Sequence, residues 1–482
     1  MRVCLINPPR IQPKAWGKPN VFPPIVMASV AAVLEKKRYQ VSIIDSPTEG
    51  WENLEELDAT KYRVGLNSEV IAGRIRDWKP DVVIVEIPFS GWSKTAFEVV
   101  TIAKRVNREI TVVLFGLHPS SRPESCLEDS EADFVVVGEP EITIDELIDT
   151  LAQKKSSFDN INGLGFRKNG KFLLTTKRAL IQDLDTLPLP ARHLLPMKVY
   201  AEAVKQNPLR GEITQPYTIV ITSRGCPFNC VFCTHSIIWG KQWRYRSPKN
   251  VVDEVEHVLK KYGIKQIDFA DDNMTWSRDR MAQICDLIVE RSLHFEWFTP
   301  NGVRADTLDE ELLRKMKKAG CKKIRVAPES GVQRVVSDIA KKNLNLKKVE
   351  NAIIVAKKVG IKVGVFFVMG LIGETKTDIE ATISYAHKLK RLGAESFVFS
   401  IAMPLYGTAF YEQAKAGDFI RKGFCDYALA ATEPLVETPE WTAQEISELC
   451  MKANAINRTV TRKKVKNAIR HPVKTAKLLL RI

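Results

Sequence analysis

Residues 222–233, which read TSRGCPFNCVFC, are the most informative segment of this chain. They place three thiols, Cys226, Cys230 and Cys233, in the pattern C-x3-C-x2-C directly after the apolar run YTIVI at 217–221. Three thiolates on one loop can hold three irons of a [4Fe–4S] cluster and leave the fourth iron without a protein ligand. An open coordination position is typical of a reactive metal site, so we expect these three cysteines to bind a reactive cluster.

A structural zinc site is the alternative interpretation of this loop, because His235 would complete a Cys3His ligand set. Zinc ligands usually come as C-x2-C pairs from two separated elements, which this spacing does not match. The remaining six cysteines are isolated from one another: Cys4, Cys126, Cys285, Cys321, Cys425 and Cys450. Isolated thiols behave as small apolar groups, so a second cluster is not expected and the pattern fits a reducing cytosol.

The segment after residue 217 alternates apolar runs with helical patterns. Six such runs lie at 217–223, 265–271, 295–300, 322–330, 362–370 and 396–404. Strands that are each followed by a helix predict a partial (β/α) TIM-type barrel, which we place at residues 213–410. The active face of such a barrel lies at the carboxyl ends of its strands, where the cysteines are also found.

Residues 1–150 show a similar alternation. Short apolar runs lie at 2–7, 41–46, 81–87, 111–116 and 133–138, with helical patterns between them. This α/β pattern predicts a doubly wound, Rossmann-like domain with a buried parallel sheet. Ligands of open α/β sheets bind beyond the carboxyl ends of the strands, and the candidate residues there are Asn7, Pro8, Gly116, His118, Gly138 and Glu139.

Two further regions complete the expected organisation. Residues 151–212 have weak periodicity and contain three prolines between Asp183 and Pro196, which indicates a linker or strap. Residues 411–482 are expected to be helical and to end in a basic tail. The amino terminus has no pattern of a secretory signal, and the longest uncharged apolar run, 363–373, is far short of the ~20 residues of a spanning helix. A cytoplasmic protein is therefore expected.

Most of the excess positive charge of this chain lies in its last 32 residues. The chain has 482 residues, with 72 Lys and Arg against 57 Asp and Glu, so its net charge is +15. Its 45% hydrophobic and 27% charged residues exclude a disordered, collagenous or coiled-coil protein. Residues 451–482 hold ten Lys or Arg and no acid, which leaves an unremarkable +5 for the other 450 residues.

The cysteine loop, with Phe232 as the aromatic residue in C-x3-C-x-aromatic-C, resembles that of the radical S-adenosylmethionine (SAM) superfamily. The Asn-Pro-Pro segment at 7–9 and the doubly wound domain resemble the branch with an N-terminal cobalamin-binding domain. The resemblance covers residues 1–410 and implies three cofactors: a [4Fe–4S] cluster on the three cysteines, SAM, and cobalamin.

Three later segments match the family in order along the chain. They follow the second, fourth and fifth strands of the barrel, at 269–273, 327–331 and 368–374. The resemblance implies that they supply contacts to SAM or order the cluster loop through Asp271, Asp272, Glu329, Ser330, Gly370, Gly373 and Glu374. The alternative for each is a polar residue that merely closes a strand.

The cobalamin contacts follow from the same resemblance. Asn7, Pro8, Gly116, His118, Gly138 and Glu139 would face the corrinoid. The D-x-H-x-x-G signature of many cobalamin domains is absent after the first strand, so an axial histidine is not expected. The chain also departs from the family at Ile25-Val26-Met27, where leucine and glycine usually follow the paired prolines.

The resemblance implies radical chemistry at an unactivated carbon, in which a 5′-deoxyadenosyl radical takes hydrogen and methylcobalamin supplies a methyl group. We therefore expect C-methylation of an apolar or lipid-like small molecule, with a one-electron reductant such as ferredoxin or flavodoxin as partner. The alternatives are a cobalamin-dependent cyclase or rearrangement enzyme, a radical SAM enzyme that modifies RNA, and a non-enzymatic cobalamin or iron–sulfur sensor. The sequence assigns no catalytic acid or base.

The basic tail has a pattern typical of segments that bind membrane surfaces. After Pro472, apolar residues of the segment 473–481 lie on one helical face and Lys474, Lys477 and Arg481 on another. Such a segment can become helical at an interface, which favours peripheral binding to anionic lipid. The alternatives are a solvated tail and a nucleic-acid contact, the latter disfavoured by the lack of aromatic residues for stacking.

Overall fold

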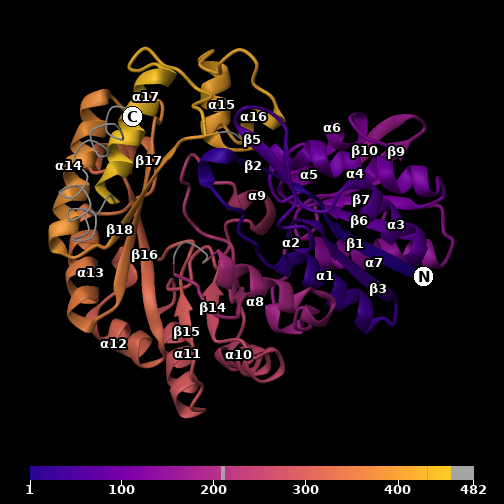
Figure 1. Ribbon diagram of the computed structural model, residues 1–482, viewed down its shortest axis with the longest axis horizontal. Coiled ribbons are helices and arrows are strands. Elements are labelled where there is room, and N and C mark those ends of the chain that lie inside the picture. Colours follow the sequence, from indigo (N-terminus) through magenta and orange to yellow (C-terminus); the bar gives the residue numbers. More distant parts are fainter. Residues whose placement is uncertain (208–211, 431, 458–482) are drawn as a thin grey trace, which may run out of the picture.

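The N-terminal domain is built around a seven-stranded sheet in the computed structural model, which describes residues 1–207, 212–430 and 432–457 (Figure 1). The strand order is β10-β9-β8-β7-β6-β1-β3. The strands are β1 (Arg2–Asn7), β3 (Gln40–Asp45), β6 (Val82–Glu86), β7 (Thr111–Phe115), β8 (Phe134–Val136), β9 (Leu164–Lys168) and β10 (Lys171–Leu174). The first five pair in parallel, whereas β9 and β10 are antiparallel, so the sheet continues past residue 150 to Leu174.

Helices cover both faces of this sheet, as expected for a doubly wound domain. Alternate strand residues divide into two apolar clusters, one packed against α1, α7 and α8 and the other against α3, α4 and α6. The helices are α1 (Ile25–Lys36), α2 (Ser46–Glu49), α3 (Ser68–Trp78), α4 (Ser93–Val106), α5 (Leu117–Ser121), α6 (Pro123–Glu128), α7 (Pro140–Ala152) and α8 (Met197–Gln206). A small antiparallel sheet, β2 (Arg10–Pro13), β5 (Lys61–Val64) and β4 (Leu54–Glu56), was not expected.

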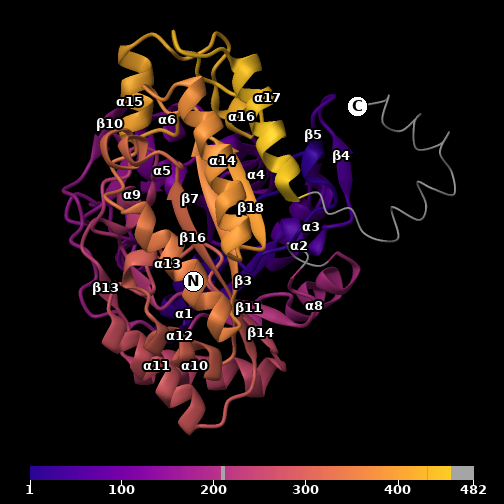
Figure 2. The same ribbon diagram turned by 90° about the vertical axis from the view of Figure 1, so that its left-hand side faces the viewer.

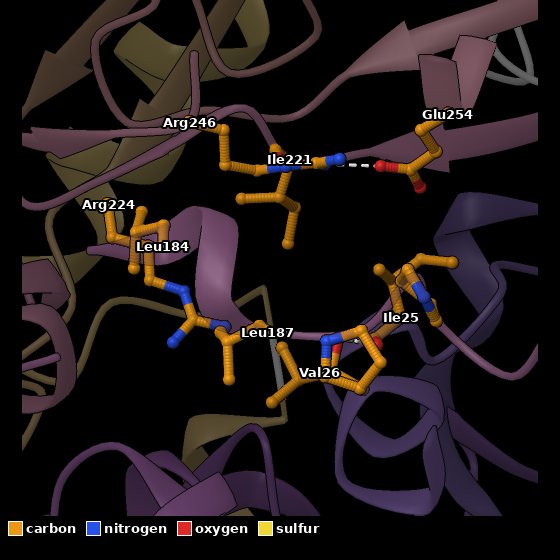
Figure 3. Close-up of a pocket in the computed structure, with 11 residues that line it drawn as sticks. Ile25, Val26, Leu184, Leu187, Ile221, Arg224, Arg246 and Glu254 are labelled. Atoms are coloured by element: carbon orange, nitrogen blue, oxygen red, sulfur yellow. Dashed lines mark hydrogen bonds and ion pairs between the residues drawn. The ribbon is translucent and has the colours of Figure 1, made fainter. Parts of the chain in front are cut away.

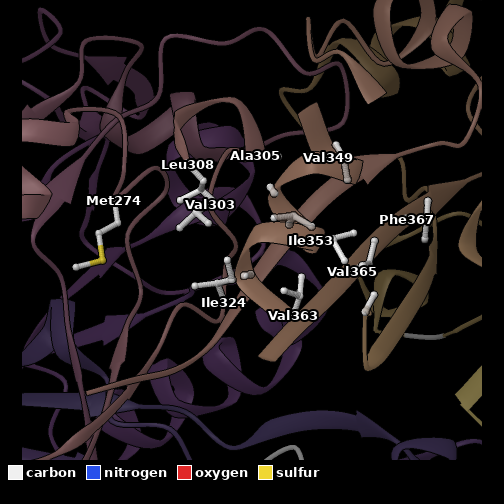
Figure 4. Close-up of a cluster of buried hydrophobic side chains, with 14 of the residues drawn as sticks. Met274, Val303, Ala305, Leu308, Ile324, Val349, Ile353, Val363, Val365 and Phe367 are labelled. Atoms are coloured by element: carbon white, nitrogen blue, oxygen red, sulfur yellow. The ribbon is translucent and has the colours of Figure 1, made fainter. Parts of the chain in front are cut away.

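The second domain contains six parallel strands in the order β11-β14-β15-β16-β17-β18, which confirms the partial barrel. The strands are β11 (Tyr217–Val220), β14 (Gln266–Phe269), β15 (Glu296–Phe298), β16 (Cys321–Glu329), β17 (Lys362–Met369) and β18 (Ser396–Ile401). The helices that follow them are α10 (Pro248–Tyr262), α11 (Arg278–Glu290), α12 (Glu310–Lys318), α13 (Leu346–Val359) and α14 (Lys376–Leu392). Their apolar faces and the strands form one core (Figure 4).

The C-terminal region is helical and consists of α15 (Ala409–Ala416), α16 (Asp426–Leu429) and α17 (Ala443–Asn454). Helix α17 lies along β18, the edge strand of the barrel (Figure 2). The side chains of Asn454 and Asn457 exchange hydrogen bonds with the backbone of Phe399 and Phe397. This contact satisfies backbone groups that an open edge strand would otherwise expose. The proposed membrane-binding tail, 472–482, lies outside the described residues.

The strap between the domains is anchored in both of them. Arg192 of the strap forms a buried ion pair with Glu254 of α10, at 2.6 Å. Nearby, the strap, α1 and the barrel surround a cavity of about 40 Å³, in which Arg246 also reaches Glu254 (Figure 3). The two domains are therefore joined by buried polar contacts as well as by chain connectivity. No helix in the described part of the chain is long and apolar enough to cross a membrane.

Candidate functional site

A cavity of about 360 Å³ lies at the carboxyl ends of the barrel strands. One wall is formed by the cysteine loop, with Cys226, Cys230 and Cys233 all lining the cavity. Two of the expected SAM residues, Asp272 and Glu329, also line it. The apolar part of the wall includes Phe228, Phe232, Phe366, Val368 and Val398. The structure thus brings the cysteines, two acids and an apolar wall to one space.

The three cysteine side chains are partly exposed to this cavity. Burial raises the pKa of Cys226 and Cys230, and the nearby cations Lys342 and Arg304 oppose this shift. Burial also raises the pKa of Cys233, to about 12. Thiols become metal ligands as thiolates, so adjacent positive charge favours the ligand form. The donor set, three thiols on one loop beside two cations, fits a [4Fe–4S] cluster with one iron left open.

The start of the cysteine loop is held by Asp271. Its carboxylate accepts hydrogen bonds from the Thr222 amide, at 2.7 Å, and from the hydroxyls of Thr222 and Ser223. Gly225 follows with a φ of +84°, and a Cβ there would meet the carbonyl oxygen of Gln242 at 2.3 Å. The loop therefore requires glycine at this position. Asp271 does not line the cavity, so its contacts order the loop.

Asp272 lies on the cavity side of the same segment. Its carboxylate pairs with Nδ1 of His235 and accepts a hydrogen bond from the amide of Gly225, at 3.3 Å. Desolvation lowers the pKa of His235, but the Asp272 carboxylate outweighs this and raises it. The ring of His235 is thus engaged by an acid. Among the described residues, no group of three or more His, Cys, Asp or Glu side chains is arranged to hold a single metal ion.

Lys342 and Arg304 were not identified from the sequence. Lys342 pairs with the buried carboxylate of Glu329, and Glu329 itself has a left-handed backbone with a φ of +68°. Arg304 lies over the ring of Phe228, at 3.6 Å from its centroid, and donates hydrogen bonds to the backbone carbonyls of Lys342 and Asn343. Arg304 also pairs with Asp306, at 2.6 Å, so each of the two cations at this side of the cavity has an acidic partner.

The other expected SAM residues lie outside the cavity lining. The hydroxyl of Ser330 is hydrogen-bonded to Thr382 at 2.9 Å. The carboxylate of Glu374 accepts hydrogen bonds from the amides of Gly370, at 2.8 Å, and Leu371, at 3.2 Å. Burial raises the pKa of Glu374 to about 7. Gly370 and Gly373 both have positive φ values, so these residues shape the turn after β17.

The carboxyl end of the N-terminal sheet presents a second group of polar residues. Asn7 donates a hydrogen bond to Asp45, at 2.7 Å, and Tyr200 of α8 also bonds to Asp45. Glu86, at the end of β6, is buried, and burial together with Asp45 and Glu141 raises its pKa to about 8. A carboxyl group that keeps its proton at neutral pH can donate a hydrogen bond to a ligand at this edge.

The remaining expected cobalamin residues have different surroundings. Pro8 is buried. Gly116 has a φ of +116°, and a Cβ there would meet the carbonyl oxygen of Ile87 at 2.7 Å. Gly138 faces open space, because a Cβ there would meet nothing within 4 Å. Glu139 is not open to a ligand, because Arg224 and Arg244 both bind its carboxylate.

His118 is the single histidine in residues 1–150, and its side chain is fully buried. Its Nε2 lies 3.5 Å from a carboxylate oxygen of Asp426, which the C-terminal region brings to this domain. Burial lowers the pKa of His118. Asp426 also accepts hydrogen bonds from Ser93, at 2.9 Å, and Tyr406, at 2.7 Å. His118 therefore lies at a contact between the N-terminal domain and the C-terminal region.

Each of the two domains matches a known protein family. A model of the radical SAM superfamily matches residues 220–386, and a model of the B12-binding domain matches residues 19–148. The chain is 32% identical to an uncharacterized methyltransferase, PH0819, of Pyrococcus horikoshii, over 94% of this chain and 91% of that protein. It is 31% identical to the cytidylyl-2-hydroxyethylphosphonate methyltransferase of Streptomyces wedmorensis, over 94% and 89%.

Two solved structures share the fold. The cobalamin-dependent SAM radical enzyme OxsB, with aqua-cobalamin and SAM bound, has a TM-score of 0.74 at 16% identity and covers 99% of this chain and 71% of its own. The radical SAM methyltransferase TsrM of Kitasatospora setae, with cobalamin and a [4Fe–4S] cluster bound, has a TM-score of 0.68 at 17% identity, over 87% and 79%. The two matching domain models and the full-length relatives show that this chain belongs to the cobalamin-dependent radical SAM methyltransferases.

Proposed function

We propose that the protein methylates an unactivated carbon of a small molecule with an apolar or lipid-like body. One observation carries the proposal: the cavity that contains the three cysteines also has an apolar wall from β17 and β18, including Phe366, Val368 and Val398. Similarity to proteins named as methyltransferases supports methyl transfer as the reaction.

Different residues of the barrel would bind the cluster, SAM and the substrate. The three cysteines would hold the cluster, which together with SAM supplies a radical able to take hydrogen from carbon. Lys342 would exchange its contact with Glu329 for the carboxylate of SAM, while Asp272 and Glu329 would accept hydrogen bonds from its ammonium or hydroxyl groups. Phe366 and Val398 would hold the substrate carbon and exclude water.

The N-terminal domain would hold cobalamin at the carboxyl end of its sheet. Asn7, Pro8, Gly116 and Gly138 stay our proposed contacts, because they lie in the loops after the strands. The carboxylate of Glu139 is bound by two arginines, and the side chain of His118 is fully buried, so neither is open to a ligand. We therefore propose that the corrinoid binds without a histidine ligand from this domain.

The test is anaerobic reconstitution of the full chain with iron, sulfide and hydroxocobalamin, followed by SAM and a one-electron reductant. We expect 5′-deoxyadenosine to form in the wild type and to be lost in Cys230→Ala. Cys425→Ala is the matched control, because Cys425 is exposed and lies outside the cavity lining. Failure of the wild type to form 5′-deoxyadenosine, or its formation in Cys230→Ala, would contradict the proposal.

A second measurement separates methylation from ring formation or rearrangement. SAM with a trideuterated methyl group should transfer its label to a candidate substrate with an apolar body. Formation of 5′-deoxyadenosine with a changed but unlabelled product would instead support a cyclase or rearrangement enzyme. Labelled RNA would support the modifying-enzyme alternative, and corrinoid binding without any turnover would support a sensor.

A further inference from the structure

Four buried charged side chains connect the N-terminal domain to the cluster loop. Glu139 and Glu141 lie at the start of α7, immediately after the loop that follows β8. Arg224 belongs to the short strand β12 (Ser223–Arg224), two residues before Cys226. Arg244 belongs to β13 (Arg244–Tyr245), which pairs with β12. Two acids from one domain thus face two bases from the other.

The two arginines bind the two glutamates through short hydrogen bonds, and Glu139 is shared by both arginines. Arg224 binds Oε1 of Glu139 at 3.0 Å and both carboxylate oxygens of Glu141. Arg244 binds the two oxygens of Glu139 at 2.9 and 3.0 Å. Glu139 also accepts a hydrogen bond from the amide of Ile181, at 2.7 Å, so the strap joins the same group.

All four side chains are at least nine-tenths buried. The exposed fraction is 3% for Glu139, 0% for Glu141, 7% for Arg224 and 3% for Arg244. Their charges balance, which is the condition under which buried ions are tolerated. Apolar side chains of similar size often stabilise a protein as well as a buried ion pair does, so such a set is weak evidence for stability alone. Its directional bonds do fix geometry.

The cluster loop has little freedom at the point where Arg224 enters it. Asp271 binds Thr222 and Ser223 from the barrel side, just before Arg224. Gly225, just after Arg224, is packed so tightly against the Gln242 carbonyl that a side chain would not fit. The path of residues 222–225 is therefore set from two directions, by the barrel and by the N-terminal domain.

We propose that the N-terminal domain positions the cluster: Glu139 and Glu141 act through Arg224 as positioning residues for the loop that holds Cys226. Neither acid touches the cavity, so their effect on the cluster is transmitted by the backbone between residues 224 and 226. A cluster held by a loosened loop should change its electronic environment and lose iron more readily. This assigns the cobalamin-binding domain a structural part in the iron–sulfur site.

The experiment compares Glu139→Gln, Glu141→Gln and the double variant with the wild type, all reconstituted anaerobically as the full chain. The readouts are the electron paramagnetic resonance spectrum of the reduced cluster, with and without SAM, and the rate of iron loss to a chelator. We expect an altered spectrum and at least tenfold faster iron loss in the double variant, without any corrinoid present. The visible absorbance of the freshly loaded cluster reports separately that the cysteines still bind it.

Two controls separate positioning from general damage. Glu146→Gln removes an acid from the same helix, where Glu146 pairs with Arg178 and its side chain is 43% exposed. Asp45→Asn removes a fully buried carboxylate of the same domain whose hydrogen bonds go to Asn7 and Tyr200 and not to the cluster loop. We expect Glu146→Gln to match the wild type, and Asp45→Asn to be less stable with an unchanged cluster spectrum.

A folded double variant with the wild-type spectrum and rate of iron loss would overturn the proposal. The same spectral change in Asp45→Asn would also overturn it, because any damage to the domain would then suffice. If the double variant does not fold, Glu141→Asp gives a milder change, since it keeps the charge and shortens the reach toward Arg224. In that variant an unchanged spectrum and rate would overturn the proposal in the same way.

Discussion

Asp271 offers the sharpest test of how the barrel builds its cysteine loop. The carboxylate is 2% exposed and accepts three hydrogen bonds, one from the Thr222 amide and two from the hydroxyls of Thr222 and Ser223. Replacing it with alanine would leave the buried amide without a partner and would remove the stronger of two negative charges that act on Arg280, the other being Asp185. Asp271→Asn keeps the shape, so its oxygen can still accept from the amide while the hydroxyls turn to accept from its NH2 group.

The expected costs of the two substitutions differ. Hydrogen bonds to a charged acceptor contribute about 1.5–3 kcal/mol each, and an orphaned buried donor costs about 1–3 kcal/mol. These terms overlap, so we expect Asp271→Ala, which loses three such bonds, to lower the free energy of unfolding by about 3–5 kcal/mol. We expect Asp271→Asn to cost about 1–2 kcal/mol, because it loses charge but keeps the bonds.

Urea unfolding of the anaerobically reconstituted protein measures these costs, and iron content reports on the loop. The alanine variant should bind less iron per chain, whereas the asparagine variant should retain most of it. Asp286→Asn is the control, since that side chain is 58% exposed and makes a surface pair with Lys315. The reasoning is refuted if Asp271→Ala unfolds within about 0.5 kcal/mol of the wild type and keeps its full iron content.

Three further predictions concern separate parts of the chain. The pKa of Glu86 is raised from an ordinary value of 4.5 to about 8, so the folded state keeps a proton that the unfolded chain releases. The stability that this proton contributes is complete below pH 4.5 and is lost as the pH rises to 8. Relative to the wild type, Glu86→Gln should therefore gain roughly 1.4 kcal/mol per pH unit in urea unfolding across that window, and a pH-independent difference would contradict it. Lys342→Met should weaken SAM binding by roughly 10–100-fold in calorimetry while the cluster still forms, because one charged hydrogen bond is lost; unchanged affinity would exclude Lys342 from the site. Removing residues 472–482 should reduce co-sedimentation with anionic liposomes, and no change would end the case for a membrane-binding tail.

The strand runs of both domains could be predicted because buried parallel strands are continuously apolar. The short polar strands could not. The hairpin of β9 and β10 contains Arg167, Lys168 and Lys171, which are typical of a solvated edge and resemble a loop in sequence. All three residues of strand β4 are exposed, so no alternation of buried and exposed residues marks it. In both cases long-range pairing, rather than local pattern, forms the strand.

In the candidate site, too, residues with a local sequence pattern could be predicted and residues that depend on long-range contacts could not. Cys226, Cys230 and Cys233 could be found because their spacing is local to one loop. Lys342 could not, because its partner Glu329 lies 13 residues earlier in the sequence, before a short helix at Val335–Ile339, and lysine is common in this basic chain. The sequence also placed Glu139 in a suitable loop, but it carries no sign that Arg224, in the other domain, takes up the carboxylate.

Two buried acids, Glu254 and Glu86, have pKa values shifted in opposite directions because their charged neighbours differ. Glu254 is buried between Arg192 and Arg246, and their charges outweigh the effect of burial and lower its pKa. Burial raises the pKa of Glu86, and two acids, Asp45 and Glu141, raise it further. Burial and these two acids raise the pKa of Glu86 to about 8, so it keeps its proton at neutral pH at the sheet edge that we propose for cobalamin. Because a neutral carboxyl group can donate to an amide of the corrin periphery, Glu86 is the side chain whose substitution should most directly report on that cofactor.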